Sequence, residues 1–353
     1  MAILDFRGVG ITALAAAVPA RVVKNRTYQV DRYGAAAVAE LVDKIGVEER
    51  RFAEPGVCAS DLCFAAADML LHENDVDRAT IDLLVCVTET PDQRMPGNAF
   101  LLHKRLQFGK HCICLDLPLC CAGFPYALSV VFSMMLSGQL RCALLLNGDT
   151  SSRMYSPNDR STAFLFGDAG TAALVECDSQ YGESSFSLNS DGERAHYIEI
   201  PAGGARIRSS PETLVERVID EHGNARTAEH ALMLGGDVFN FVLSEVPQDV
   251  SRLLKHLDRA LGDYQYIVFH QANSFINSYL ARKLKLSPQQ VLSSIAEFGN
   301  TSSASIPLTL VNSFQEKDRC TAGVLLSAFG VGMSWSTASL HLTNCHISHL
   351  LDI

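Results

Sequence analysis

The sequence predicts an α/β protein made of two similar halves, and two observations lead to this fold class. The first is the alternation of segments of helical periodicity with near-continuous apolar runs, which are typical of strands in a sheet covered on both faces. The second is an internal echo: TIDLLVCVTETPD (80–92) resembles DYQYIVFHQANSF (263–275), and RCALLLNGDTSS (141–152) resembles TAGVLLSAFGVG (321–332). The echo indicates a duplicated unit joined near residues 175–185, although chance likeness between apolar strands is an open alternative at this point.

The helices and strands follow from the spacing of apolar residues. Three segments have helical spacing, namely 35–46, 59–74 and 239–257, and the last contains a proline. A further helix is predicted after CCAGF, because Pro125 suits a first helical turn and the apolar run ALSVVFSMML follows it. Five apolar runs are predicted as buried strands: 81–89, 112–119, 142–150, 266–272 and 323–330.

Length and charge exclude several classes of protein. The chain has 353 residues, which suits one large domain or two of ordinary size. Its net charge of −10 argues against a dedicated nucleic-acid binder. The N-terminus lacks the basic-then-apolar layout of a signal peptide, and the longest strongly apolar stretch, 127–136, is too short to span a bilayer. We therefore expect a cytoplasmic protein that neither inserts into a membrane nor binds nucleic acid.

The cysteines predict neither a disulfide framework nor a metal site. There are 11 of them, an odd number, and no Cys-x-x-Cys pair occurs. Outside the adjacent pair Cys120 and Cys121, the ordinary interpretation is that of small buried apolar residues in a reducing compartment.

Three polar groups stand in loops that end predicted strands, where α/β proteins place their sites. Cys121 would lie at a helix start, where free N–H groups favour the thiolate. His270 follows the apolar run YIVF, and Asn300 lies in FGNTSSAS. Each has an ordinary structural interpretation: a buried cysteine, a core histidine and a turn asparagine. Together they indicate a site for covalent acyl transfer.

Five motifs, in order along nearly the whole chain, carry a family resemblance. They are CAGFPYAL (121–128) with Asp116 five residues earlier, FGDAG (166–170), HQAN (270–273), GNTS (299–302) and AFGVGMSW (328–335). This set resembles β-ketoacyl-acyl-carrier-protein synthase III, a condensing enzyme of the thiolase superfamily. The resemblance implies a thiolase-like five-layered αβαβα fold with two similar halves. We expect residues 1–178 to form the N-terminal half, which holds the nucleophilic cysteine, and residues 179–353 to form the C-terminal half, which holds the histidine and asparagine.

The resemblance also implies the catalytic roles. Cys121 takes the place of the family's nucleophile and Cys120 that of a small neighbour. Cys121 would accept the acyl group of an acyl-CoA or acyl-ACP primer, with its own backbone N–H and that of Val331 stabilising the oxyanion. His270 and Asn300 would donate hydrogen bonds to the thioester oxygen of malonyl-ACP during decarboxylation. The product would be a 3-oxoacyl-ACP, with thioesters as substrates and neither a metal nor a redox cofactor. A homodimer is expected.

Further residues are carried over as binding groups. Those expected to contact CoA or the carrier protein are Lys44, Arg153, Asn273, Arg282 and Lys283. Those expected in the acyl pocket are Phe166, Met333 and Met95, the last reaching the pocket of a partner subunit.

The sequence departs from the family pattern at several of these positions. Glu40 and Lys44 stand where a tryptophan and an arginine contact the CoA nucleotide, and Phe275 replaces an arginine of the carrier dock. Val331 replaces a glycine. These departures predict a specialised synthase rather than the housekeeping initiator of fatty-acid synthesis.

Three alternatives stay open at this point. The first is an acyltransferase of the same fold that passes the acyl group to an amine or hydroxyl without decarboxylation. The second is a non-catalytic partner subunit of a heteromeric synthase. The third is an unrelated hydrolase with cysteine, histidine and asparagine. No role is assigned to the polar segment 203–226.

Overall fold

Two sheets of the same topology form the centre of the molecule. The computed structural model describes residues 2–353, apart from the side chain at position 316. The first sheet has the strand order β6-β5-β7-β8-β2. Its strands are β2 (Val9–Val18), β5 (Leu83–Val87), β6 (Ile113–Leu117), β7 (Cys142–Thr150) and β8 (Asp168–Cys177). β5 is parallel to both β6 and β7, whereas β8 is antiparallel to β7 and to β2.

The second sheet repeats this pattern with the order β15-β14-β16-β17-β9. Its strands are β9 (Glu183–Ser190), β14 (Tyr266–Phe269), β15 (Val291–Leu292), β16 (Arg319–Gly330) and β17 (Ser334–Ile347). β14 is parallel to β15 and β16, and β17 is antiparallel to β16 and β9. β5 and β7 thus correspond to β14 and β16, as the sequence echo predicts, and the two-half fold is confirmed.

The first and last strands of the chain each pair with the sheet of the opposite half. β1 (Ala2–Arg7) pairs with β9 of the second sheet, and β18 (Leu351–Asp352) pairs with β2 of the first. The two sheets join where His346 and Ile347 of β17 pair with β2. Residue 178 lies between β8 and β9, so the predicted boundary falls between the strands of the first sheet and those of the second. The terminal strands β1 and β18 are the exceptions, because each pairs with the sheet of the other half.

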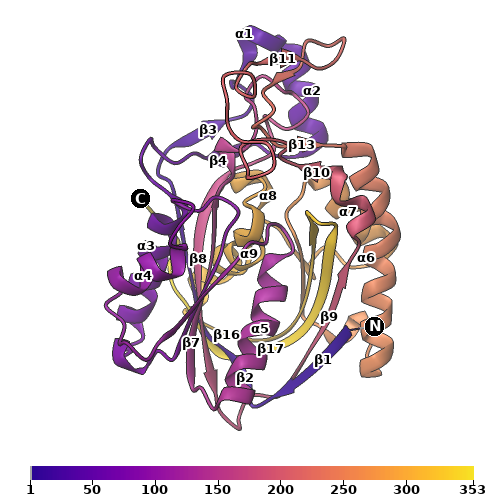
Figure 1. Ribbon diagram of the computed structural model, residues 1–353. Helices are drawn as coiled ribbons and strands as arrows, with labels where there is room; N and C mark the ends of the chain where they lie inside the picture. Colours follow the sequence, from indigo (N-terminus) through magenta and orange to yellow (C-terminus); the bar gives the residue numbers. More distant parts are fainter. Residues whose placement is uncertain (1) are drawn as a thin grey trace.

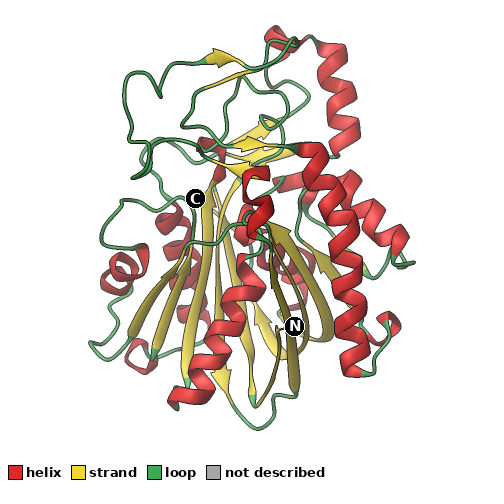
Figure 2. Ribbon diagram, turned by 45° about the vertical axis from the view of Figure 1, so that its right-hand side comes forward, coloured by secondary structure: helices red, strands yellow, loops and turns green. Residues whose placement is uncertain are grey.

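Helices complete five layers, seen edge-on in Figure 1 and turned in Figure 2. Between the sheets lie α5 (Gly123–Gly138) and α9 (Ser305–Phe314), whose apolar residues share one core with both sheets. The outer face of the first sheet is covered by α3 (Ala59–Glu73) and α4 (Asn98–Arg105). The outer face of the second is covered by α6 (Gly235–Leu257), which continues through Pro247, and α7 (Ser274–Lys283). In the described part of the chain, no helix is long and apolar enough to span a membrane.

A cap of small elements covers one end of the sheets, at the top of Figure 1. It holds α1 (Val30–Tyr33), α2 (Ala35–Ile45), β3 (Val22–Lys24), β4 (Glu49–Arg51), β10 (Ile198–Glu199), β11 (Arg217–Val218), β12 (Ala225–Arg226) and β13 (Leu232–Met233). The short helix α8 (Ile295–Phe298) lies beneath it. Segment 203–226 includes the hairpin of β11 and β12.

A glycine lets the cap meet the second half. α2 ends at Gly46, whose φ of 68° lies in the left-handed region. A Cβ at this position would lie 2.3 Å from the Cβ of Ser274, the first residue of α7. The close approach brings Lys44 at the end of α2 near Asn273 at the start of α7.

Gly170 provides a test of the packing between β8 and α3. A Cβ at position 170 would lie 2.4 Å from backbone atoms of Leu62 and Cys63. Because backbone cannot move aside cheaply, we expect Gly170→Ala to lower the free energy of unfolding by about 1–3 kcal/mol. Urea denaturation measures this difference. Gly182→Ala is the matched control, since its Cβ would meet nothing within 4 Å. Equal midpoints for the two variants would contradict the packing argument.

Candidate active site

Three loops from both halves meet at one cavity of about 310 Å³. Cys121 lies between β6 and α5, His270 directly follows β14, and Asn300 follows α8. All three side chains line the cavity and are nearly buried, with exposed fractions of 7%, 1% and 5%. The structure therefore brings together the three groups that the sequence predicts as a catalytic set.

Cys121 is held where the two halves touch. Cys121 and Ala122 form a turn that leads into α5, so the free N–H groups at the start of this helix lie beside the thiol. A Cβ on Gly330 of β16 would lie 2.5 Å from the Cβ of Cys121. Gly123 is equally close-packed, because its Cβ would lie 2.8 Å from Val87 and 3.1 Å from Ser303. A side chain at Gly330 would therefore displace Cys121, and one at Gly123 would displace Val87 or Ser303.

The two adjacent cysteines have opposite electrostatic roles. Their sulfur atoms lie 3.8 Å apart, and the Cys120 sulfur also lies 3.0 Å from Oγ of Ser302. The contact with Cys120 lowers the pKa of the Cys121 thiol well below its usual value, and the nearby His270 imidazole adds to this effect. The same contact and burial raise the pKa of Cys120 well above its usual value. These opposite shifts favour the thiolate form at Cys121 and the protonated thiol at Cys120.

His270 is oriented by contacts on both sides of the ring. Its backbone N–H donates to the carbonyl oxygen of Ser327 at 2.8 Å, and Phe329 packs edge-on against the imidazole. Nδ1 lies 2.7 Å from Oγ of Ser305, the first residue of α9. Because Ser305 occupies Nδ1, the ring presents Nε2 for contacts in the cavity.

Asn300 is fixed by its backbone and its side-chain oxygen. Its N–H donates to the carbonyl of Leu165 at 2.8 Å, and its own carbonyl accepts from Gly167 at 3.0 Å. Oδ1 accepts from the N–H of Ser302 at 2.9 Å. The amide NH₂ is thereby left as the donor that Asn300 offers to the cavity.

A buried arginine supports the loop that pairs with Asn300. Arg50 is 1% exposed, and its guanidinium donates to the carbonyl oxygens of Ala163 and Phe166 at 2.7 and 3.2 Å. Nε donates to Oδ1 of Asn25 at 2.8 Å, and the group lies 4.8 Å from the ring centre of Tyr28. Burial lowers the pKa of Arg50 to about 10. These contacts hold residues 163–166 against the site.

A buried carboxyl group lies behind the cysteine pair. Asp149, at the end of β7, has no exposed surface and accepts from Oγ1 of Thr88 at 3.0 Å and from the N–H of Glu89 at 2.8 Å. Oγ of Ser303 approaches its other oxygen at 3.4 Å, which links the two halves. Burial raises the pKa of Asp149 to about 6. Sequence reasoning passed over Asp149, Arg50 and Ser305, although Ser305 lies in the same polar loop as Asn300.

The other predicted residues divide between the cavity and the surface. Phe166 lines the cavity and stacks on Tyr155 at 3.7 Å, while Lys44, Asn273 and Val331 also line it. Lys44 is exposed and so marks the open end. Much of the remaining wall is apolar and was not predicted: Leu41, Ile45, Leu165, Ile198, Met233, Val238 and Ile276.

Five predicted residues do not line this cavity. Met333 has no exposed surface and packs in the core beneath α6, so it forms no part of the pocket wall. Met95 is 82% exposed on the loop before α4. Arg153 is exposed and donates to the carbonyl of Glu54. Arg282 and Lys283 lie exposed on α7, and Lys283 donates to the carbonyl of Leu243.

Comparison with known proteins agrees with this geometry. Residues 115–192 match the family model of 3-oxoacyl-[acyl-carrier-protein] synthase III, and residues 254–342 match the model of its C-terminal region. The β-ketoacyl-[acyl-carrier-protein] synthase III of Symbiobacterium thermophilum is 33% identical, over 96% of this chain and 99% of its own.

Solved structures of β-ketoacyl synthases have the same fold as this chain. The 3-oxoacyl-(acyl-carrier protein) synthase of Burkholderia xenovorans LB400 superposes with a TM-score of 0.92 and 35% identity, covering 100% of this chain and 99% of its own. The priming β-ketosynthase of the R1128 polyketide pathway superposes with a TM-score of 0.81 and 26% identity, over 98% and 99% of the two chains. With these likenesses along its whole length, the chain belongs to the β-ketoacyl-[acyl-carrier-protein] synthase III family of decarboxylating condensing acyltransferases.

Proposed function

We propose that this enzyme acylates Cys121 from an acyl thioester and then condenses the acyl group with malonyl-ACP, releasing carbon dioxide and a 3-oxoacyl-ACP. The observation that carries the proposal is the convergence of Cys121, His270 and Asn300 on one cavity, with the pKa of Cys121 lowered. Retention of both hydrogen-bond donors beside the thiolate favours condensation over simple acyl transfer.

In the first step the Cys121 thiolate attacks the carbonyl carbon of the primer thioester. The backbone N–H groups of Cys121 and Val331 stabilise the oxyanion of the tetrahedral intermediate. Collapse of the intermediate breaks the bond to the leaving thiol, which takes up a proton, and leaves an acyl group on Cys121. Kinetics of the ping-pong type follow from this covalent intermediate.

In the second step the malonyl thioester occupies the same cavity. Nε2 of His270 and the side-chain amide of Asn300 donate to the thioester oxygen, so that negative charge can develop there as carbon dioxide leaves. The carbon nucleophile attacks the acyl carbonyl on Cys121. The bond to sulfur then breaks, the 3-oxoacyl thioester departs and the Cys121 thiolate is regenerated.

The cavity wall supports a thioester with a long flexible arm. Its apolar lining suits methylene groups, and Ser161 and Asn273 offer polar atoms to amide groups along the arm. Lys44 at the open end would meet a phosphate. The apolar lining supports a primer longer than acetyl and a specialised pathway. In the proposed homodimer, exposed Met95 would reach the pocket of the partner subunit.

The carrier protein is proposed to dock beside α7. Arg282 and Lys283 supply positive charge to an acidic carrier. Phe275 on the same helix is 46% exposed and stacks on Phe239 at 5.3 Å, so an apolar contact stands where the family pattern has an arginine.

The covalent step is tested by intact-protein mass spectrometry after incubation with acyl-CoAs and acyl-ACPs of graded chain length. We expect one acyl group on the wild type and none on Cys121→Ala, because no other cysteine with a lowered pKa lines the cavity in the described part of the chain. Cys120→Ala is the matched control and should still be acylated. Label that persists on Cys121→Ala would refute the assignment of the nucleophile.

The pairing of the cysteines predicts a shift in pH dependence. Because the Cys120 thiol stabilises the Cys121 thiolate, its removal in Cys120→Ala should raise the pKa of Cys121. The pH at which alkylation of Cys121 reaches half its maximal rate should therefore move upward, as followed by peptide mass spectrometry. Cys120→Ser keeps a donor and should move it less. An unchanged midpoint in Cys120→Ala would show that the contact does not activate the nucleophile.

Asn300 separates the two half-reactions. Asn300→Ala should leave acylation of Cys121 close to wild type, while release of carbon dioxide from malonyl-ACP falls about 10²–10³-fold, the cost typical of losing one oxyanion donor. Radiolabelled carbon dioxide release and intact mass measure the two steps on the same sample. Equal loss of both steps would argue that Asn300 acts only by holding the loop.

A further inference from the structure

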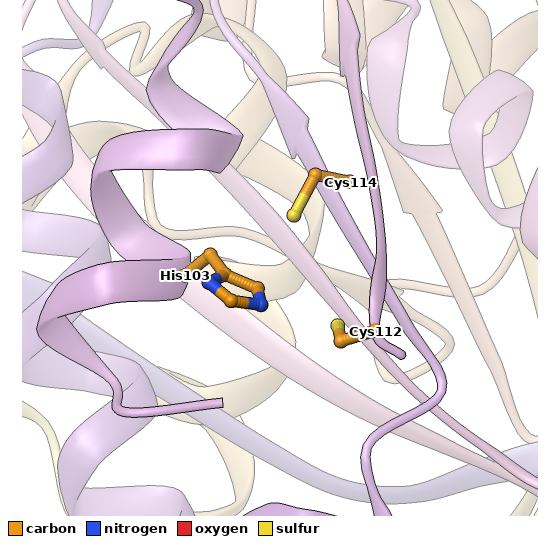
Figure 3. Close-up of side chains that lie close together, drawn as sticks. All are labelled: His103, Cys112 and Cys114. Carbon is orange, nitrogen blue, oxygen red and sulfur yellow. The ribbon is translucent and has the colours of Figure 1, made fainter. Parts of the chain in front are cut away.

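Three residues with metal-binding side chains meet at the outer edge of the first sheet, away from the active-site cavity. They are His103 on α4, Cys114 in β6 and Cys112 just before that strand. One ligand atom from each lies within 4.8 Å of the others, and all three side chains are half-buried. Figure 3 shows the imidazole of His103 turned toward the two sulfur atoms.

The arrangement follows from local structure on both sides. Residues 112, 114 and 116 alternate along the strand and therefore share one face. Asp116 on this face accepts from the N–H of Ala99 at 3.0 Å, which fixes the first turn of α4 over β6. The last turn of the helix then carries His103 over the cysteine pair. Nε2 of His103 lies 3.0 Å from the carbonyl of Gly109, in the loop that leads from α4 back to the strand.

We propose that His103, Cys112 and Cys114 bind a Zn²⁺ ion. Two thiolates and one imidazole are donors that zinc prefers, with bonds of about 2.3 Å to sulfur and about 2.0 Å to nitrogen. Such bonds place the donors roughly 3.3–3.8 Å apart in a tetrahedron, so a small inward movement of half-buried side chains completes the set. Water takes the fourth position. Each cysteine loses its proton to solvent on binding, so affinity rises with pH.

The ion would restrain β6, the strand that leads to Cys121. It would close the loop from His103 to Cys112 and tie α4 to β6, a strand at the edge of its sheet that pairs only with β5 in the described structure. β6 ends at Leu117, three residues before the cysteine pair. The proposal departs from the sequence expectation of no metal site, which rested on the absence of Cys-x-x-Cys. The spacing here is Cys-x-Cys, which a strand presents on one face.

Cobalt and zinc titration of the full-length, reduced protein tests the site. Co²⁺ serves as the spectroscopic probe, because thiolate ligation gives a charge-transfer band in the near ultraviolet and tetrahedral geometry gives strong visible bands. We expect one Co²⁺ per chain, displaced by one Zn²⁺. Cys112→Ser, Cys114→Ser and His103→Gln should each weaken binding by more than the roughly 10- to 100-fold that loss of an outer-shell partner costs. Circular dichroism confirms that each variant is folded.

Two control variants locate the ion. Cys58→Ser removes a half-buried cysteine outside the cluster and should leave binding unchanged. Cys121→Ala removes the active-site thiol and should also leave it unchanged. A thiolate–cobalt band that survives Cys112→Ser and Cys114→Ser but vanishes in Cys121→Ala would overturn the proposal, and so would the absence of any stoichiometric band in the wild type. Neither result would bear on the acylation of Cys121.

Discussion

The active site depends on how closely the two halves of the molecule approach each other at Cys121. Cys121 belongs to the first half, whereas His270 and Asn300 belong to the second, so the proposed chemistry requires loops from two sheets to meet at one cavity. Gly330 makes this possible, because a Cβ there would lie 2.5 Å from the Cβ of Cys121. Gly123 allows a similarly close approach to Val87 and Ser303, because a Cβ there would lie 2.8 Å from the first and 3.1 Å from the second. Interiors are packed too densely to absorb even one extra methyl group here.

The buried guanidinium of Arg50 holds residues 163–166, the loop that pairs with Asn300. Burial removes water from the Arg50 guanidinium, which costs a large free energy of desolvation. Contacts with carbonyl oxygens, with Asn25 and with the face of Tyr28 offset part of that cost. The carbonyls that it binds lie in residues 163–166, the same stretch whose Leu165 accepts from the N–H of Asn300. A cap residue thereby positions a catalytic candidate more than 200 residues away in the sequence.

Activation of the thiol is shared among neighbours rather than supplied by one base. Cys120 contributes most to the lowered pKa of Cys121, and His270 contributes next, against the opposing effect of burial. Ser302 contacts Cys120 and donates its N–H to Asn300, so one short loop touches both ends of the site. In a cavity of low dielectric constant such contacts act more strongly than they would in water. These contacts favour the thiolate form of Cys121 in the free protein.

The sequence by itself determined the α/β class, the repeated unit and the family, and it singled out the three polar side chains that meet in the cavity, because apolar periodicity and short motifs are local properties of the chain. The resemblance of its motifs to the family also predicts Cys121, rather than Cys120, as the nucleophile. Tertiary structure alone decided the rest. Met333 lies in the core rather than in the pocket wall, Arg50 supports the loop beside Asn300, and His103 meets a pair of cysteines across a strand. These placements depend on which elements pack together. The pattern within one segment does not specify which side chains of a distant segment will contact it.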